Sequence, residues 1–348
     1  MKICYFGNYN PELSRNKIYG RGLRENGVEV IECRDSSRGF SKFRELYRKH
    51  RKIKNEYDVL IVGYPGHSMV PFAKLISRKL VVFDALCTSW EAEALSHGVN
   101  FWRRIKARIV DSLAVRFADI VLVETEQQRK FFSERFGKNE KYKVVYTGVD
   151  DSLFFRDESV LSNKQFTVLF RGRLTPEAGV KYVLGASEIL KNEDIVWKII
   201  GFGQMEKEVK ADLESLNLPK VELNMQELPI SELRKEMCKC HVSLGQFEDN
   251  ERLKRTIPHK AFESLAMGIP YITARTEGVA EILTDGENCL MVNKGDAKDL
   301  AEKILKLKND PGLAKKLAEK GRVLYEKEFT PKILAGKILN YIAEIPYS

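Results

Sequence analysis

The sequence predicts an α/β protein with two Rossmann-like domains, each built on a doubly wound parallel sheet. Apolar segments of strand length alternate with segments of helical periodicity, an order typical of parallel sheets with right-handed crossovers. A polar run at 156–165 interrupts the alternation, which then starts again. The 348 residues suffice for two domains that each bury a core. We therefore expect domains at 1–150 and 166–330, a linker at 151–165, and a C-terminal helix within 331–348 that packs back on the first domain.

Each element is predicted from apolar periodicity and from the turn residues that bound it. In the first half, strands are expected at 2–6, 29–33, 59–62, 80–83, 120–123 and 143–146, and helices at 18–26, 40–55, 70–78, 101–118 and 126–136. In the second half, strands are expected at 166–170, 196–200, 221–223, 242–244 and 271–274. The helices expected there lie at 179–191, 205–216, 230–238, between Pro258 and Gly268, and at 296–308, 311–328 and 331–344.

The composition argues against several classes of protein. No apolar run reaches the length of a membrane span, and the chain opens on a predicted strand, so we expect neither a spanning helix nor a signal peptide. The six cysteines include no C-x-x-C pair, which favours reduced thiols in a cytoplasmic protein over a disulfide framework or a zinc site. The first strand is not followed by G-x-G-x-x-G, which disfavours a dinucleotide-binding domain.

Basic residues are concentrated in the first half of the chain. Residues 1–150 contain 28 Lys and Arg against 18 Asp and Glu, whereas residues 151–348 contain 30 against 31. Two predicted helices, around 44–54 and 102–108, carry much of the excess and suit an anionic membrane surface, so we expect peripheral attachment to the inner face of the cell membrane. In the second helix we expect the stripe of Ile105, Ile109 and Leu113 to face the core. A solvated basic surface is the alternative interpretation.

The segment 256–271 combines a helix start with charged side chains. Pro258 suits the first position of a helix and Gly268 suits its end. The first N–H groups of a helix are unpaired and its dipole is positive there, so this N-terminus suits an anion. Lys260 adds a cation, and Glu263 adds an acceptor for hydroxyl groups. An ordinary amphipathic helix with solvated charges is the alternative.

Other candidate residues follow predicted strands, and the carboxyl ends of parallel strands are where such sheets bind ligands. In the second half, Arg171 and Arg173 flank a glycine at a strand end, where arginines can clamp phosphate. In the first half, Gly7 begins a polar loop, and His67 and Asp84 follow the third and fourth strands. Each of these has a structural alternative. The loop after Gly7 is then an ordinary connection, His67 is a structural histidine, and Asp84 caps the next segment.

In their order along the chain, these motifs resemble those of the retaining GT-B-fold glycosyltransferases of family 4, the glycosyl transferases group 1. The segment Gly172-Arg-Leu-Thr-Pro-Glu-Ala-Gly-Val180 is similar to the family's G-R-L-x-x-E-K-G-V, and Gly201-Phe-Gly203 to its G-x-G turn. Phe262-Glu-Ser-Leu-Ala-Met-Gly-Ile-Pro270 resembles E-x-x-A-x-G-x-P, and 278–281 with 285–288 resemble G-x-x-E and D-G-x-N. The resemblance covers nearly the whole chain and implies a cleft between two domains.

The resemblance also implies a role for each candidate residue. The second domain would bind a nucleotide-diphosphate sugar, and the first would bind the acceptor. Catalytic candidates are then Arg173 and Lys260 at the diphosphate, and Asp84 and His67 at the acceptor. The donor-binding candidates are Gly7, Arg171, Gly172, Gly201, Gly203, Met225, Glu227, Leu228, Thr256, Ile257, Pro258 and Glu263, with the ribose on Glu263 and the base near 225–228. The acceptor-binding candidates are Asn10, Ser14 and Arg15, in a loop after Gly7 that would close over the donor.

Two positions depart from the family pattern. Ala178 stands where the family usually has a lysine that pairs with the diphosphate, and Arg255 stands where it usually has a glutamate. The segment 256–263 instead fits a T-x-P-x-K-x-x-E variant of some bacterial and archaeal members. We expect Lys260, and after it Arg255, to replace the lost charge, since buried phosphate without a cation is unfavourable.

The resulting prediction is transfer of a hexose from a nucleotide-diphosphate sugar to a hydroxyl acceptor, with retention of configuration. A lipid-linked or cell-surface glycan precursor is the expected acceptor. Because no D-x-D motif stands out, we expect no metal and no other cofactor. The alternatives are a donor-binding protein without transferase activity, consistent with Ala178 and Arg255, an epimerase on the same fold, and a nucleic-acid-binding protein. The last is not expected, because aromatic platforms and a groove-reading helix are not evident.

Overall fold

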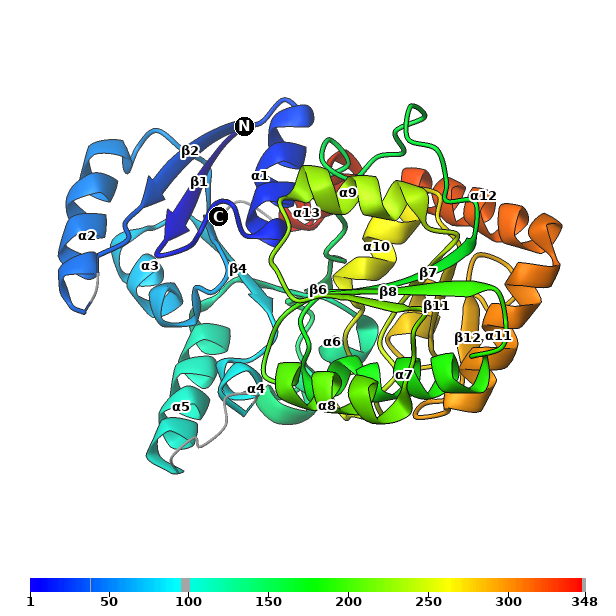
Figure 1. The fold of residues 1–348 in the computed structure, drawn as a ribbon. Coiled ribbons are helices and arrows are strands. Elements are labelled where there is room, and N and C mark those ends of the chain that lie inside the picture. Colours follow the sequence, from blue (N-terminus) through cyan, green and yellow to red (C-terminus); the bar gives the residue numbers. More distant parts are fainter. Residues whose placement is uncertain (38, 95–100, 346–348) are drawn as a thin grey trace. The chain divides into compact units, whose positions relative to one another are not determined.

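The computed structural model describes residues 1–37, 39–94 and 101–345, without the side chains of 92–94. The chain divides into two compact units, Met1–Gly148 with Thr330–Ser348, and Val149–Phe329. In each unit, helices pack on the faces of a six-stranded parallel sheet (Figure 1). The prediction of an α/β protein with two doubly wound parallel sheets is therefore confirmed. We call the units unit 1 and unit 2.

Unit 1 has the strand order β2-β1-β3-β4-β5-β6. The strands are β1 (Lys2–Gly7), β2 (Glu29–Arg34), β3 (Val59–Val62), β4 (Leu80–Leu86), β5 (Ile120–Val123) and β6 (Tyr142–Val144). The helices are α1 (Ser14–Glu25), α2 (Ser41–Ile53), α3 (Val70–Ile76), α4 (Ser89–Ala94), α5 (Phe101–Phe117), α6 (Glu126–Phe136) and α13 (Pro331–Ala343), with the short 3₁₀ helix η1 (His67–Met69). Strands β3 and β5 are buried along their whole length, which explains their continuous apolar sequence.

Unit 2 has the strand order β12-β11-β10-β7-β8-β9. The strands are β7 (Phe166–Arg171), β8 (Ile195–Ile200), β9 (Val221–Asn224), β10 (Val242–Leu244), β11 (Tyr271–Ala274) and β12 (Leu290–Val292). The helices are α7 (Val180–Ile189), α8 (Glu206–Leu216), α9 (Ile230–Lys239), α10 (His259–Ala266), α11 (Ala297–Asn309) and α12 (Pro311–Glu328), with the 3₁₀ helices η2 (Pro176–Ala178) and η3 (Val279–Glu281). The central strands β7, β10 and β11 carry much of the core.

Three elements differ from the sequence prediction. Helix α1 begins at Ser14 rather than at 18, so Ser14 and Arg15 lie on a helix and not in the loop. Leu13 occupies its N-cap position without a side-chain hydrogen bond, so no capping residue marks this start in the sequence. Strand β12 and helix α4, of three and six residues, were not predicted.

The segment after residue 150, expected as a linker, packs on unit 2. Phe154 is buried, and the backbone N–H of Asn163 donates to the carbonyl oxygen of Lys239 at 3.0 Å. At the other end of the chain, α13 lies beside α1 in unit 1 (Figure 1). The two helices approach so closely that a Cβ on Gly22 would lie 1.9 Å from the carbonyl oxygen of Pro331. Unit 1 is therefore assembled from both ends of the chain.

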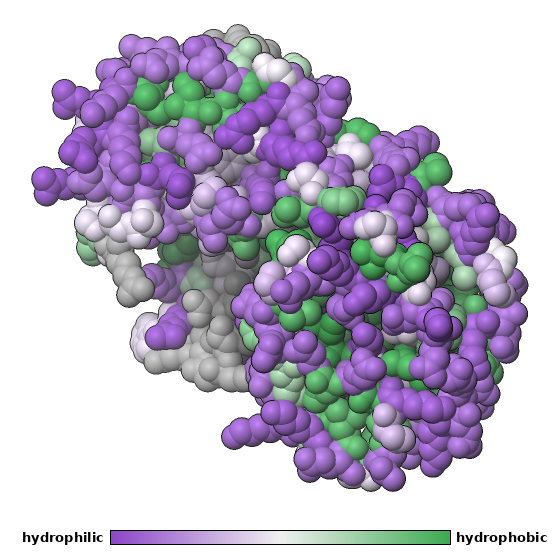
Figure 2. Space-filling model, turned by 45° about the horizontal axis from the view of Figure 1, so that its top comes forward, coloured by the Kyte–Doolittle hydropathy of each residue, from purple (hydrophilic) through white to green (hydrophobic). Residues whose placement is uncertain are grey.

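The apolar stripe of α5 does not face the core. Ile109 and Leu113 are 55% and 41% exposed, whereas Ala107, Ala114 and Val115 are buried. The prediction was wrong for Ile109 and Leu113, while Ile105 is partly buried, because α5 packs on other residues of its sequence instead. On the face drawn in Figure 2, hydrophilic residues cover most of the surface and hydrophobic ones form smaller patches. Within the described part of the chain, no helix has both the length and the hydropathy to cross a membrane.

Candidate functional site

The strand order of unit 2 identifies the position at which this fold binds ligands. Strands β7 and β10 are neighbours, but the chain continues from β7 to β8 on one side and from β10 to β11 on the other. Connections that leave in opposite directions open a crevice at the carboxyl ends of the two strands, and open α/β sheets bind ligands there. Arg171 is the last residue of β7, and Gly245 follows the last residue of β10. The candidate site is therefore built around these two strand ends.

Two glycine turns pack against each other at this edge of the sheet. A Cβ on Gly201 would lie 1.9 Å from the carbonyl oxygen of Gly172, and one on Gly203 would lie 2.7 Å from that of Leu174. Gly172 and Gly203 also have φ values of +119° and +150°, which side chains rarely adopt. The backbone N–H of Gly172 donates to the carbonyl oxygen of Ile200 at 2.9 Å, and this hydrogen bond joins the two turns. The predicted turns are thus present, with Gly201 and Gly203 required by backbone contact and Gly172 by its positive φ.

Arg173 extends from the first of these turns and is exposed. Its guanidinium carbon lies 5.1 Å from the centre of the Phe202 ring, which belongs to the second turn. Among the residues described by the structure, Arg173 has no carboxylate within ion-pair distance. A cation held over an aromatic ring in this way keeps its donor groups available for an anion.

Lys260, in the first turn of α10, is almost fully buried at the same strand ends. Its Nζ donates to the carbonyl oxygen of Gly245 at 3.2 Å and lies 4.2 Å from the centre of the Phe170 ring. A Cβ on Gly172 would lie 3.6 Å from this Nζ. The pKa of Lys260 is lowered to about 7, mainly by burial and also by the nearby Arg171, while Glu263 acts in the opposite direction. The ammonium group therefore lacks a full counter-charge in this structure.

Glu263 lies one turn further along α10, where it forms an ion pair with Arg171. Arg171 also donates through Nη2 to the carbonyl oxygen of Lys260 at 3.3 Å. The prediction placed Arg171 at the donor. In the structure Arg171 is 4% exposed, and its guanidinium holds α10 against β7 instead of facing an open site. The side chain of Glu263 is 16% exposed, so part of the carboxylate is accessible.

The two departures from the family pattern have different surroundings. Ala178 is 1% exposed and belongs to the hydrophobic core, so its side chain contributes no charge to the site. Its carbonyl oxygen accepts from the backbone N–H of Phe247 at 3.3 Å, two residues from the Gly245 carbonyl that holds Lys260. Arg255 is partly buried in the loop before α10. Lys260 thus reaches the same β10 loop against which Ala178 packs.

The remaining predicted donor contacts occupy two loops of unit 2. Thr256 and Ile257 precede α10, and Pro258 takes its N-cap position with a φ of −58°. Met225 follows the edge strand β9 and lines a cavity of about 640 Å³. Glu227 is exposed and Leu228 is partly buried in the same loop. Because β9 lies two strands from β7 in the sheet, this loop is separate from the crevice at β7 and β10.

In unit 1, two of the residues predicted at the acceptor, Arg15 and Asp84, form a buried ion pair. Arg15 donates through Nε to Asp84 at 2.6 Å and through Nη1 to the carbonyl oxygen of Val145 at 3.0 Å. Arg15 is 1% exposed and Asp84 is fully buried, so neither side chain is open to a ligand in this structure. Burial raises the pKa of Asp84, and Arg15 acts against this shift. The pair holds α1 against β4 and the end of β6.

His67 and Gly7 lie at the carboxyl edge of the same sheet. His67 is buried, with Nε2 2.8 Å from the carbonyl oxygen of Cys87 and 3.9 Å from Asp111. Burial lowers the pKa of His67, and Asp111 acts in the opposite direction. Gly7 ends β1 with a φ of +132°, Asn10 is exposed in the following loop, and Ser14 begins α1.

Sequence reasoning missed two residues that organise this edge of unit 1. Asn16 accepts from the hydroxyl of Tyr5 at 3.2 Å and from the backbone N–H of Tyr64 at 3.0 Å, so it joins α1 to β1 and to the loop after β3. Asp111 accepts from the backbone N–H groups of Ser89 and Trp90 at 2.8 and 3.1 Å and so caps α4 from α5. Nothing in the sequence near either residue indicates these distant partners.

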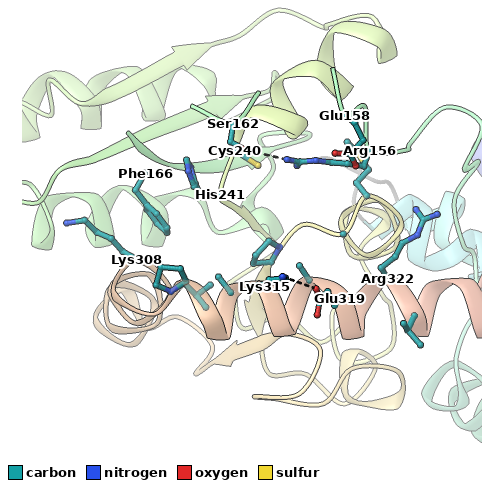
Figure 3. A pocket seen from close by; sticks show the side chains of 18 of the residues that line it. Arg156, Glu158, Ser162, Phe166, Cys240, His241, Lys308, Lys315, Glu319 and Arg322 are labelled. Atoms are coloured by element: carbon teal, nitrogen blue, oxygen red, sulfur yellow. Dashed lines mark hydrogen bonds and ion pairs between the residues drawn. The ribbon is translucent and has the colours of Figure 1, made fainter. Parts of the chain in front are cut away.

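Another cavity of unit 2 lies away from the candidate site. It has a volume of about 940 Å³ and lies at the opposite edge of the unit 2 sheet, next to Phe166 at the start of β7 and His241 just before β10 (Figure 3). Lys315 and Glu319 of α12 line its other side and form an ion pair at 3.8 Å. Its lining includes none of the predicted site residues.

Comparison with known proteins identifies the family of this chain. The profile of the family described as glycosyl transferases group 1 matches residues 151–324, which is half of the chain. Over 209 residues the chain is 29% identical to an uncharacterized glycosyltransferase of Methanocaldococcus jannaschii, a match that covers 60% of this chain and 56% of that protein. Over 234 residues it is 24% identical to the capsular polysaccharide biosynthesis glycosyltransferase CapM of Staphylococcus aureus, with 62% and 59% covered. The chain thus spans less than two thirds of the length of these relatives.

Solved structures share the whole fold at low sequence identity. HepE of Anabaena, solved with UDP and glucose, superimposes with a TM-score of 0.72 at 18% identity and covers 99% of this chain and 100% of its own. The sucrose-phosphate synthase of Thermosynechococcus elongatus gives a TM-score of 0.70 at 15% identity, with 99% and 98% covered. These likenesses agree with the GT-B fold. The matched profile contains β7, α10 and the glycine turns between them, and by this match the chain belongs to the glycosyl transferases group 1 family.

Proposed function

We propose that this protein transfers a hexose from a nucleotide-diphosphate sugar to a hydroxyl group of an acceptor, with retention of configuration. The observation that carries the proposal is the placement of two cations, Arg173 and Lys260, around Gly172 at the carboxyl ends of β7 and β10. Family membership supports transferase chemistry, and two related proteins support the substrates. CapM is named for capsular polysaccharide biosynthesis, and HepE was solved with UDP-glucose.

The two cations suit the charge that develops in this reaction. The bond between the anomeric carbon and the phosphate oxygen breaks, and the acceptor oxygen bonds to the anomeric carbon on the same face. The acceptor proton passes to the departing phosphate oxygen. Negative charge on the diphosphate grows as its bond breaks, so Arg173 and Lys260 stabilise the transition state more than the ground state.

Lys260 takes the place of the cation that Ala178 lacks. It lacks a full counter-charge in the buried site, and a diphosphate beside it would supply that charge. Arg173 offers planar donors for bidentate contact with phosphate oxygens. The N–H groups at the start of α10, next to Thr256, Ile257 and Pro258, add the positive end of a helix dipole.

The other donor contacts are assigned by the resemblance to the family, and the base then lies beyond the crevice, next to β9. The accessible part of Glu263 accepts the ribose hydroxyls, while Arg171 fixes the orientation of its carboxylate. Gly201 and Gly203 let the backbone approach the donor, and the loop with Met225, Glu227 and Leu228 meets the base. The reaction proceeds without a metal ion.

Unit 1 holds the acceptor in this proposal. Asp84 and His67 are buried, so they act by positioning the loops at the carboxyl edge of the sheet. Gly7, Asn10 and Ser14 lie in or beside the loop that contacts substrate. A lipid-linked or cell-surface glycan precursor suits the basic surface of this unit.

The proposal is tested by measuring glycosyl transfer from UDP-, GDP- and ADP-hexoses to lipid-linked and soluble acceptors in the presence of EDTA. We expect transfer from one nucleotide class, unaffected by the chelator. Arg173→Ala and Lys260→Ala should each lower kcat/KM by roughly a hundredfold or more. Lys306→Ala, at an exposed lysine of α11, is the matched control and should leave the rate unchanged. Loss of activity with EDTA would refute metal independence, and unchanged activity in both site variants would refute the site.

A donor-binding protein without transferase activity is the second candidate. The buried position of Ala178 favours it, because the lysine expected there is replaced by a core residue. A thermal-shift assay distinguishes the two, since a ligand that binds only the native state raises the melting temperature. A shift with a nucleotide sugar, without transfer or hydrolysis across the acceptors, would support the binding protein.

A further inference from the structure

Helix α5 carries its large apolar side chains on the side opposite the core. Trp102, Ile109 and Leu113 are 71%, 55% and 41% exposed, and their spacing of seven and four residues places them on one face of the helix. The opposite face is buried through Ala107 and Ala114. A surface helix normally buries its larger apolar residues and exposes polar ones. α5 reverses this arrangement, and an exposed apolar stripe of this kind marks an interaction surface.

The charges around this stripe have one sign. Within Phe101–Phe117 the basic residues are Arg103, Arg104, Lys106, Arg108 and Arg116, and all of them are exposed. The acidic residue of the helix, Asp111, is buried and is used to cap α4. Among the described residues, Arg103, Arg104, Lys106 and Arg116 have no carboxylate within ion-pair distance. The described part of this face therefore presents apolar groups beside positive side chains that no described carboxylate pairs with.

We infer that α5 docks unit 1 on an anionic lipid bilayer. In this arrangement the helix lies in the plane of the interface, with Trp102, Ile109 and Leu113 among the acyl chains and the basic side chains at the lipid phosphates. Tryptophan is well suited to this boundary, because its ring is apolar and its N–H is polar. The inference does not depend on the sugar donor. It adds to the proposed function only that a lipid-linked acceptor would be met at the membrane surface.

Two other occupants fit the surface less well. A second copy of the chain would bring two sets of five cations together, and like charges across an interface oppose association. Nucleic acid would contact the cations and the ring of Trp102, but it would leave the aliphatic side chains of Ile109 and Leu113 without an apolar partner. An anionic bilayer matches both the charge and the apolar stripe.

The test uses the full chain and vesicles of phosphatidylcholine, with or without about 30 mol% phosphatidylglycerol. We expect co-sedimentation with the anionic vesicles, weakening as salt rises. Arg103→Glu/Arg104→Glu/Lys106→Glu should lower the partition coefficient roughly tenfold or more. Lys306→Glu/Lys316→Glu/Lys327→Glu makes the same change in net charge at exposed lysines of unit 2 and should reduce binding far less.

A second pair of variants isolates the apolar stripe. Ile109→Ser/Leu113→Ser should lower binding to the anionic vesicles, whereas Ile189→Ser/Val323→Ser, at exposed positions of unit 2, should not. Trp102 fluorescence should shift to the blue on binding, and Trp102→Phe should remove that shift while retaining most of the binding. Circular dichroism and nucleotide binding establish that each variant is folded.

Several outcomes would overturn the inference. These are equal binding to neutral and anionic vesicles, equal losses in the α5 and unit 2 variants, and no binding at all by a folded protein. Light scattering that reveals a dimer disrupted by the Ile109 and Leu113 changes would assign the surface to a second copy instead. Salt-sensitive retention on DNA, lost in the charge variant, would assign it to nucleic acid. Failure of sugar transfer with intact vesicle binding would reject only the proposed function.

Discussion

Lys260 occupies an environment that opposes its positive charge. Its pKa is lowered to about 7 from the usual 10.5, so the folded protein binds its proton less tightly than the unfolded chain does. The resulting loss of stability is absent above pH 10.5, grows as the pH falls toward 7, and is complete below 7. The contribution of this residue to stability therefore rises with pH between 7 and 10.5.

A methionine at this position should stabilise the protein. Lys260→Met keeps the length of the side chain without its charge, and we expect the free energy of unfolding at pH 7 to rise by about 2 kcal/mol. Urea unfolding measured between pH 6 and 10 should also lose the pH dependence described above. Nucleotide-sugar binding should fall at the same time, because the site loses a cation. Equal or lower stability of the variant at pH 7 would contradict the assignment of a destabilising buried charge.

Removing a charge from the buried pair of Arg15 and Asp84 should lower the stability of the protein, in contrast to Lys260→Met. Asp84→Asn leaves the Arg15 guanidinium in the core without its counter-charge, and we expect a loss of about 3 kcal/mol in the free energy of unfolding. Lys74→Ala breaks an ion pair at 2.6 Å whose side chains are about one third exposed, and it should cost less than about 1 kcal/mol. Chemical unfolding of the two variants under one condition makes the comparison. Similar losses would mean that burial does not govern the Arg15 pair.

At the scale of elements, close backbone contact holds the turns after β7 and β8. Gly201→Ala would place a methyl group 1.9 Å from the Gly172 carbonyl oxygen, and that backbone cannot move without displacing Arg173. We expect a loss of about 2 to 4 kcal/mol in stability together with weaker nucleotide binding.

Gly137→Ala is the control that separates the effect of steric contact at Gly201 from the effect of backbone strain. Gly137 has a φ of +88° and a ψ of 152° with nothing within 4 Å of its added Cβ, so the substitution should cost backbone strain alone, about 1 to 3 kcal/mol, and leave binding unchanged. Thermal unfolding and nucleotide titration of both variants check the two expectations. Unchanged binding in Gly201→Ala would show that the turn does not position the donor.

At the scale of the whole molecule, the chain returns to unit 1 through α13. Leu334 and Ile338 are buried, and α13 covers α1 at Gly22. A chain ending at Phe329 should lose protection from hydrogen exchange in α1, because the face that α13 covers becomes exposed. Protection in β7 and β8 of unit 2 should be retained. A chain ending at Ile345 is the control, and equal protection of α1 in both truncations would contradict the prediction.

Features set by near neighbours in the sequence could be predicted, whereas features set by long-range packing could not. Except for β12, the strands of both sheets could be placed because buried parallel strands are short apolar runs between helical periods, and these patterns are local. The start of α1 could not be placed, since Leu13 carries no cap. The orientation of α5 was wrong, since its buried residues are Ala107, Asp111, Ala114 and Val115 rather than its largest aliphatic ones. Asn16 and Asp111 were missed because their partners are distant in the sequence.

The sequence by itself determined the class of fold, the glycine turns and the segment that holds Lys260 and Glu263, because periodicity and turn chemistry act between near neighbours. Only the tertiary structure decided which charges are buried against each other. It set Arg171 on Glu263 and Arg15 on Asp84, and left Arg173 exposed beside Phe202. It also turned the apolar stripe of α5 outward. The physical reason is that burial and counter-charge are properties of the packed chain, and they depend on residues that the order of the sequence does not bring together.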